Sequence, residues 1–150
     1  MRKSMKHNWS IIAAALILSL IACSCGGRPK GEHVTPSGGV FKIDTRTIGK
    51  GQVAFFHYDT AGKEVEFMVA KTATGSIKTA FDACRTCYVH KLGYRDEGGK
   101  VVCVYCGMTF DIESLDKGEG NCVPIRIEHR MEGAFVVIDQ KEIEAGAVWF

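Results

Sequence analysis

The sequence lacks the features that several large classes of protein require. It has no basic excess, because without Arg2, Lys3 and Lys6, which lie in a segment that we expect to be removed, 16 basic and 17 acidic residues remain. This balance argues against nucleic-acid binding. We find no Ser/His/Asp set, no phosphate-cradling loop and no pair of catalytic carboxylates. Hydrolysis and group transfer are therefore not expected, and we predict a protein that is not an enzyme.

The sequence also lacks a long apolar run. Its N-terminal run, Ile11 to Ala22, rises only about 18 Å as a helix, whereas the hydrocarbon layer is ~30 Å thick. After a basic start, such a run is typical of an export signal. It ends in "LIAC", which resembles the lipobox of bacterial lipoproteins and implies cleavage before Cys23 and acylation of that cysteine. We predict a lipoprotein signal over 1–22; the alternative is an ordinary secretory signal. Arg2–Lys3 is not a twin-arginine signal, so we expect the chain to cross the membrane unfolded.

Proline is scarce, and two of the three prolines fall in residues 24–39 together with five of the 17 glycines. This composition predicts a flexible tether over 23–39, with Cys25 as a passenger. Acylation of Cys23 would anchor the protein to membrane lipid. We therefore expect it in the cell envelope, facing the periplasm or the cell exterior.

The remaining residues, 40–150, predict a small, β-rich α+β domain. Residues 52–60 and 63–72 form a predicted hairpin around Ala61-Gly62, and Gly98-Gly99 predicts a second tight turn. Residues 75–84 predict one or two helical turns capped by Ser76. Two more strands, 123–129 and 134–139, are expected around Glu132-Gly133. We expect a short helix to close the chain.

Cysteine is abundant: the chain has seven, and five of them lie between residues 84 and 122. Two Cys-x-x-Cys pairs, Cys84 with Cys87 and Cys103 with Cys106, are separated by a predicted hairpin. This spacing is typical of a site in which four thiolates bind one metal ion. Gly107 follows the second pair, as glycine does in metal knuckles. Cys122 is expected at the edge of the site, as a fifth ligand or a redox-active thiol, with a buried apolar role as the alternative.

Three further roles for the cysteines compete with metal binding. A c-type haem would require histidine after each pair, where Tyr88 and Gly107 stand. A thioredoxin-like redox pair would need a βαβ setting, which we do not find. Structural disulfides suit an outward-facing protein, but five core cysteines cannot all pair. The disulfide alternative stays open.

Histidine and methionine side chains offer weaker candidates for metal ligation. His57, His90 and His129 are possible ligands, and His90 is the best placed by sequence. The methionines Met68, Met108 and Met131 would suit copper. For each of these residues we expect an ordinary packing or surface role.

The segments "DACRTCYVHKLGY", "VVCVYCGMTFDIESL" and "GNCVPI", with the closing "AGAVWF", together resemble the FtrD-like family of membrane-associated iron–sulfur proteins. The resemblance covers roughly residues 40–150. The family cysteines match Cys84, Cys87, Cys103, Cys106 and Cys122. In the family's last motif paired glycines precede the cysteine, whereas here they are separated as Gly118 and Gly120. Many members also carry transmembrane helices.

The resemblance implies a cofactor, partners and a role. Members accompany bacterial ferrous-iron uptake systems with a ferroxidase-like partner and a permease, and are thought to accept or pass electrons. We therefore expect an iron–sulfur cluster or iron on the cysteines, and a permease or redox partner of a metal-uptake system. The alternative is a partner-binding domain held together by zinc or disulfides.

Overall fold

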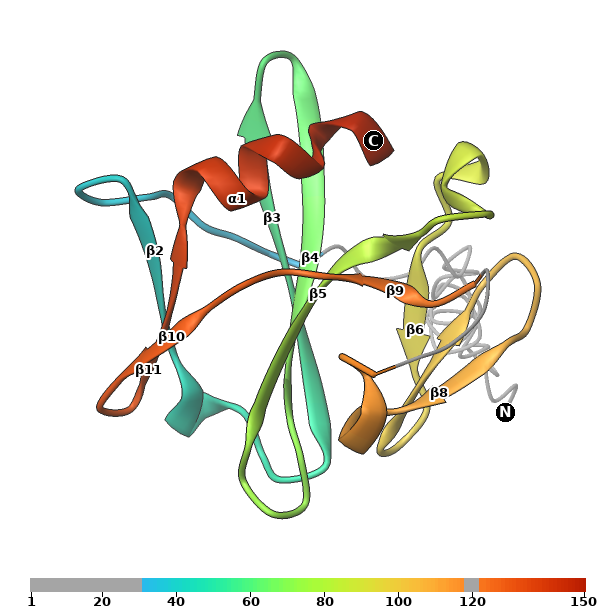
Figure 1. Cartoon of the computed structure of the whole chain (residues 1–150), viewed down its shortest axis with the longest axis horizontal. Coiled ribbons are helices and arrows are strands. Elements are labelled where there is room, and N and C mark those ends of the chain that lie inside the picture. The colour runs from blue at the N-terminus through green and yellow to red at the C-terminus, as the bar shows by residue number, and fades with distance from the viewer. Residues whose placement is uncertain (1–30, 118–121) are drawn as a thin grey trace, which may run out of the picture.

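A computed structural model describes residues 31–117 and 122–150. Three sheets make up the fold (Figure 1). The five-stranded sheet has the order β1-β3-β4-β5-β9, and the two three-stranded sheets have the orders β10-β11-β2 and β6-β7-β8. The strands are β1 (Glu32–His33), β2 (Val40–Asp44), β3 (Gln52–Thr60), β4 (Lys63–Lys71), β5 (Ile77–Cys84), β6 (Tyr94–Asp96), β7 (Lys100–Cys103), β8 (Thr109–Asp111), β9 (Pro124–Arg126), β10 (Arg130–Glu132) and β11 (Phe135–Asp139). The helices are α1 (Gln140–Ala145) and the 3-10 turns η1 (Thr45–Thr47), η2 (Tyr88–His90), η3 (Ile112–Ser114) and η4 (Gly146–Trp149). The predicted β-rich α+β class is confirmed.

Both faces of the five-stranded sheet are buried. On β4, Val65, Phe67 and Val69 point into one hydrophobic cluster, which they share with the sheet β10-β11-β2 and α1. Met68 and Ala70 point the other way, into a second cluster that contains the sheet β6-β7-β8 and three of the cysteines. The period-2 alternation of a strand sends successive side chains to opposite faces. The central sheet therefore separates an apolar core from a core that contains the thiols.

The predicted turns are confirmed. Strands β3 and β4 pair from Gln52↔Lys71 to Thr60↔Lys63, and Ala61 and Gly62 both have positive φ angles, 49° and 75°. Gly98 and Gly99, with φ angles of 61° and 87°, connect β6 to β7. Glycine adopts a positive φ angle at almost no cost in free energy. The glycines at these two turns therefore favour the turns without help from distant contacts.

The helix predicted over 75–84 is wrong: Ile77–Cys84 is the strand β5. It pairs with β4 on one side and β9 on the other. Its side chains alternate between the two clusters, with Phe81 and Ala83 in the first and Ala80 and Cys84 in the second. Pairing on both edges and burial of both faces outweigh the weak helical preference of this segment.

The strands near the C-terminus and the end of the predicted tether need adjustment. Residues 123–129 contribute β9 to the central sheet, and Gly133 joins β10 to β11, so the strand pair around Glu132-Gly133 is formed by β10 and β11. The predicted tether extends to residue 39, but within it β1 pairs in parallel with β3. Residues 31–39 therefore belong to the folded part. The predicted short C-terminal helix is present as α1.

Candidate metal centre

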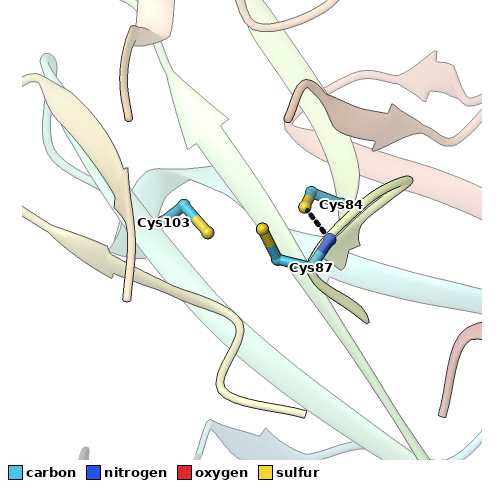
Figure 2. Close-up of side chains that lie close together, drawn as sticks. All are labelled: Cys84, Cys87 and Cys103. Carbon is cyan, nitrogen blue, oxygen red and sulfur yellow. Dashed lines mark hydrogen bonds between the residues drawn. The ribbon is translucent and has the colours of Figure 1, made fainter. Parts of the chain in front are cut away.

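The five cysteines come from strand ends and turns on one side of the central sheet. Cys84 ends β5, Cys103 ends β7, and Cys122 lies shortly before β9. Cys87 lies at the start of the turn η2, and Cys106 lies in the turn between β7 and β8. All five are free thiols in the described part of the chain. Cys103 faces Cys84 and Cys87, which lie three positions apart on another segment of the chain (Figure 2).

The sulfur atoms form two overlapping groups of three. Cys84, Cys87 and Cys103 have all three sulfurs within 4.8 Å of one another, and we call them the inner group. Cys87, Cys106 and Cys122 meet the same condition, and we call them the outer group. In the outer group the Sγ atom of Cys122 lies 3.4 Å from that of Cys106 and 3.8 Å from that of Cys87. Cys87 belongs to both groups.

In each of the two cysteine turns one backbone amide donates to a sulfur atom, as expected for metal knuckles. The amide of Cys87 donates to the Sγ atom of Cys84 at 2.9 Å (Figure 2). In the second turn, the amide of Gly107 donates to the carbonyl oxygen of Cys103 at 2.9 Å, with a φ angle of 74° at Gly107. A hydrogen bond from the amide of Met108 lowers the pKa of the Cys106 thiol, because it stabilises the thiolate. The turn between β7 and β8 therefore favours the negatively charged form of Cys106.

Burial differs between the two groups. Cys84, Cys87 and Cys103 are buried, Cys122 is half-buried and Cys106 is exposed. Burial raises the pKa of Cys87, and hydrogen bonds with the neighbouring thiols add to this effect. Burial likewise raises the pKa of Cys103, so without a cation Cys87 and Cys103 favour the neutral form. A bound cation would reverse that preference, because thiolates bind metals after losing their protons.

Tyr94 and Asp82 hold Cys122 close to the other cysteines. The Tyr94 side chain is fully buried, and its hydroxyl donates to the carbonyl oxygen of Cys122 at 2.7 Å. The amide of Tyr94 donates to Oδ1 of Asp82, a buried residue of β5, at 2.5 Å. These two bonds connect β5, β6 and the Cys122 segment. Neither residue was singled out from the sequence, because both roles depend on partners at least twelve positions away.

The three histidines predicted as possible ligands, His57, His90 and His129, belong to neither sulfur group. The His57 ring nitrogen Nδ1 lies 2.8 Å from the carbonyl oxygen of Gly31, and Nδ1 of His129 lies 2.8 Å from the hydroxyl of Thr79. His90 stacks on the ring of Tyr105 with 3.5 Å between ring centroids. Met68 is buried in the second cluster, and Met108 and Met131 are exposed. Gly118 and Gly120, and the residues up to Lys30 that include Cys23 and Cys25, lie outside the described residues.

A cavity of about 340 Å³ borders the inner group. Cys84, Cys87 and Cys103 contribute to its wall, whereas Cys106 and Cys122 do not. The rest of the wall includes aromatic, charged and small or apolar residues: Tyr88, Tyr105, Trp149, Phe150, Glu64, Glu66, Asp82, Lys63, Lys91, Gly62, Ala83, Leu92 and Gly93. Glu64 and Glu66 lie on the same face of β4 as Met68, as the strand alternation predicts. The inner group is therefore approached from the cavity, and the outer group from the surface.

The donor set fits a metal that prefers sulfur. A metal–sulfur bond of about 2.3 Å in a tetrahedral site separates neighbouring sulfurs by about 3.8 Å. The observed separations of 3.4 and 3.8 Å are close to that value. Iron–sulfur clusters, single iron ions and zinc all accept thiolates in this arrangement. The cysteines would hold such a group, and it would supply either one-electron redox chemistry or, as zinc, a structural cross-link.

The fold and the cysteines define a small β-rich protein with a cluster of thiols that could hold a metal. Residues 48–150 match the model of a family described as "Membrane iron-sulfur containing protein FtrD-like". The chain belongs to this FtrD-like family, and the predicted resemblance is confirmed. Membership supports an iron-related metal-binding role and a membrane association. Within residues 31–117 and 122–150, no helix has the length and apolarity needed to cross a membrane.

Individual proteins resemble the chain only distantly. No curated protein matches the chain significantly. Similar solved structures include the quaternary ammonium Rieske monooxygenase CntA with an inhibitor, at 12% identity and a TM-score of 0.44. A second is a quaternary ammonium Rieske monooxygenase described in relation to carnitine oxidation by gut microbiota, at 13% identity and a TM-score of 0.44. A third is CntA in complex with the substrate gamma-butyrobetaine, at 10% identity and a TM-score of 0.43. The matches cover 66%, 66% and 65% of this chain but only 30% of each of those chains.

Proposed function

We propose that this protein binds iron or an iron–sulfur cluster on its clustered cysteines and passes electrons in support of bacterial metal uptake. The observation that carries the proposal is the graded exposure of one continuous group of sulfurs. Three are buried, one is half-buried, and Cys106 is exposed. A redox centre needs this combination, because burial and hydrogen bonds to sulfur set its potential, while an exposed edge allows a partner to approach.

The surface around Cys106 supports a partner. Large apolar side chains are exposed on the two turns that carry the cysteine pairs: Val89, Leu92, Val104, Tyr105 and Met108. Stacking of His90 on Tyr105 joins the two turns. Soluble proteins seldom gather exposed apolar side chains in this way without an interaction. We propose that this surface receives a permease subunit or redox protein of the uptake system, through a small contact typical of electron transfer.

The proposal includes anchoring by lipid at Cys23. The signal over 1–22, the lipobox and the family's description as membrane proteins support it. The anchor would keep the exposed turns close to membrane partners and leave the domain outside the cytoplasm. Nucleic acid is not among the proposed partners.

The test is an analysis of the full chain, purified anaerobically in detergent. We expect iron, labile sulfide if a cluster is present, a coloured protein, and a visible spectrum that changes reversibly on reduction and reoxidation. Cys106→Ser should alter the spectrum and the potential, whereas Cys25→Ser should change neither. Iron that does not cycle between two states would contradict the electron-transfer proposal.

A second measurement addresses the apolar surface. The substitution Val89→Ser should leave iron content and spectrum unchanged, since this side chain is exposed and does not line the cavity beside the cysteines. It should slow reduction of the protein by membranes of the source organism, without slowing reduction by dithionite. Unchanged reduction by membranes would contradict a partner at this surface, and equal slowing with both reductants would show that the substitution acts on the metal centre itself.

A structural zinc site is the second candidate, and one observation favours it. Cys84, Cys87 and Cys103 belong to the hydrophobic cluster that joins the sheet β6-β7-β8 to the central sheet. A metal there would cross-link two sheets. A colourless protein that contains stoichiometric zinc and no iron, and that unfolds when zinc is chelated, would support this candidate over the first.

A further inference from the structure

We infer that the cysteines form two adjacent metal sites that share the thiolate of Cys87, so that each chain binds two metal ions. This inference rests on the proposed metal binding and specifies its stoichiometry. The inner ion would be bound by Cys84, Cys87 and Cys103, and the outer ion by Cys87, Cys106 and Cys122.

The grouping of the sulfurs is the first support. Each group of three has its sulfurs mutually within 4.8 Å, as the ligands of one ion must be. The outer group adds separations of 3.4 and 3.8 Å to Cys122, close to the tetrahedral edge of about 3.8 Å. Each group supplies three of the four ligands of a tetrahedral ion. A thiolate has more than one lone pair, so Cys87 has the electrons to bind both ions.

The charge of the five thiolates is the second support. Around a single divalent ion, four bound thiolates leave two excess negative charges in a region where three of the sulfurs are buried, and the fifth thiol is left without a metal ion. Buried charge without a counter-charge is strongly unfavourable. A second divalent ion reduces the excess to one. Two ions therefore allow all five sulfurs to bind as thiolates with little uncompensated charge.

The surroundings of the two groups are the third support. The cavity of about 340 Å³ borders all three inner sulfurs and neither Cys106 nor Cys122. The fourth ligand of the inner ion would come from this cavity, whereas the fourth ligand of the outer ion would come from solvent beside the exposed Cys106. The two ions would therefore exchange ligands, and exchange with solution, at different rates.

The test uses Cd²⁺ as the probe, added under reducing, anaerobic conditions to the metal-free full chain in detergent. Native mass spectrometry should show two Cd²⁺ per wild-type chain at saturation, and ¹¹³Cd NMR should show two resonances coupled to each other through the shared sulfur. Cys106→Ser and Cys122→Ser should each leave one tightly bound Cd²⁺. Because Cys106 is exposed, Cys106→Ser is expected to fold, and circular dichroism checks this.

Cys25→Ser is the control, and Cys87→Ser tests the shared thiolate. Cys25→Ser should still bind two ions. Cys87→Ser should weaken the binding of both Cd²⁺ ions by at least tenfold, because it removes one ligand from each ion. Saturation at one Cd²⁺ per chain would overturn the inference but not the proposed redox role, which depends on the iron protein. Two uncoupled resonances, or an outer ion unaffected by Cys87→Ser, would overturn the shared thiolate. A chain that binds no Cd²⁺ would overturn both the inference and the thiolate metal site on which it rests.

Discussion

The hydroxyl of Tyr94 donates a hydrogen bond of 2.7 Å to the carbonyl oxygen of Cys122, 28 positions along the chain. Burial raises the pKa of Tyr94 far above its ordinary range, so the hydroxyl remains a donor at any physiological pH. The Sγ atom of Cys122 lies 3.4 Å from that of Cys106. The Tyr94 bond therefore fixes the backbone that positions the fifth thiol.

Tyr94→Phe removes this hydrogen bond and keeps the ring. We expect the free energy of unfolding to fall by about 1–2 kcal/mol, since the carbonyl of Cys122 loses its partner. We also expect Cd²⁺ binding by the outer group to weaken, while the inner ion is retained. Urea denaturation and a cadmium titration measure the two effects. Tyr58→Phe, whose hydroxyl lies 3.4 Å from Nε2 of Gln140 and whose ring packs against the first cluster, is the matched control and should leave Cd²⁺ binding unchanged.

The ion pair between Lys78 and Asp116 should contribute to the free energy of unfolding in a way that depends on pH. Nζ of Lys78 lies 2.7 Å from Oδ2 of Asp116, and both side chains are about four-fifths buried (17% and 20% exposed). Lys78 lowers the pKa of Asp116 from its ordinary value of 3.8. The folded state thus binds fewer protons than the unfolded state in this range, so the stabilisation is complete above pH 3.8 and is lost as the pH falls through the lower, folded-state pKa.

Asp116→Asn should therefore lower the free energy of unfolding by about 1 kcal/mol at neutral pH. The difference from wild type should shrink below pH 3.8. Denaturation curves across this pH range check the prediction, with Asp111→Asn as a control. Asp111 is 64% exposed and lies 3.7 Å from Lys100. A constant difference at all pH values would mean that the charge of Asp116 is not the cause.

Gly146, at the end of α1, lies where there is no room for a side chain. A Cβ atom at this position would overlap the ring of Phe81 on β5. The φ angle of Gly146 is −72°, which suits any residue, so alanine would not strain the backbone. We expect Gly146→Ala to lower the free energy of unfolding by about 1–3 kcal/mol through overpacking. Val148→Ala, at a position 67% exposed, should have little effect. Unchanged or higher stability of Gly146→Ala, measured by urea denaturation, would contradict the close packing.

The predicted lipid anchor is tested at Cys23. Cys23→Ser should leave an unprocessed precursor or a released protein, because acylation requires the sulfur, whereas Cys25→Ser should remain in the membrane fraction. Fractionation and mass spectrometry of the N-terminal peptide measure the outcome. Retention of unacylated Cys23→Ser in the membrane would show that another element anchors the chain.

The sequence by itself determined the features that depend on neighbouring residues. The turns at Ala61-Gly62 and Gly98-Gly99 follow from the backbone freedom of glycine. The spacing of the two Cys-x-x-Cys pairs predicted that their thiols would come together. Only the tertiary structure decided that Ile77–Cys84 is a strand, because the choice depends on pairing with β4 and β9. It also decided the division of the sulfurs into two groups around Cys87 and the position of Cys122. Those features arise from contacts between distant segments, which local sequence patterns do not encode.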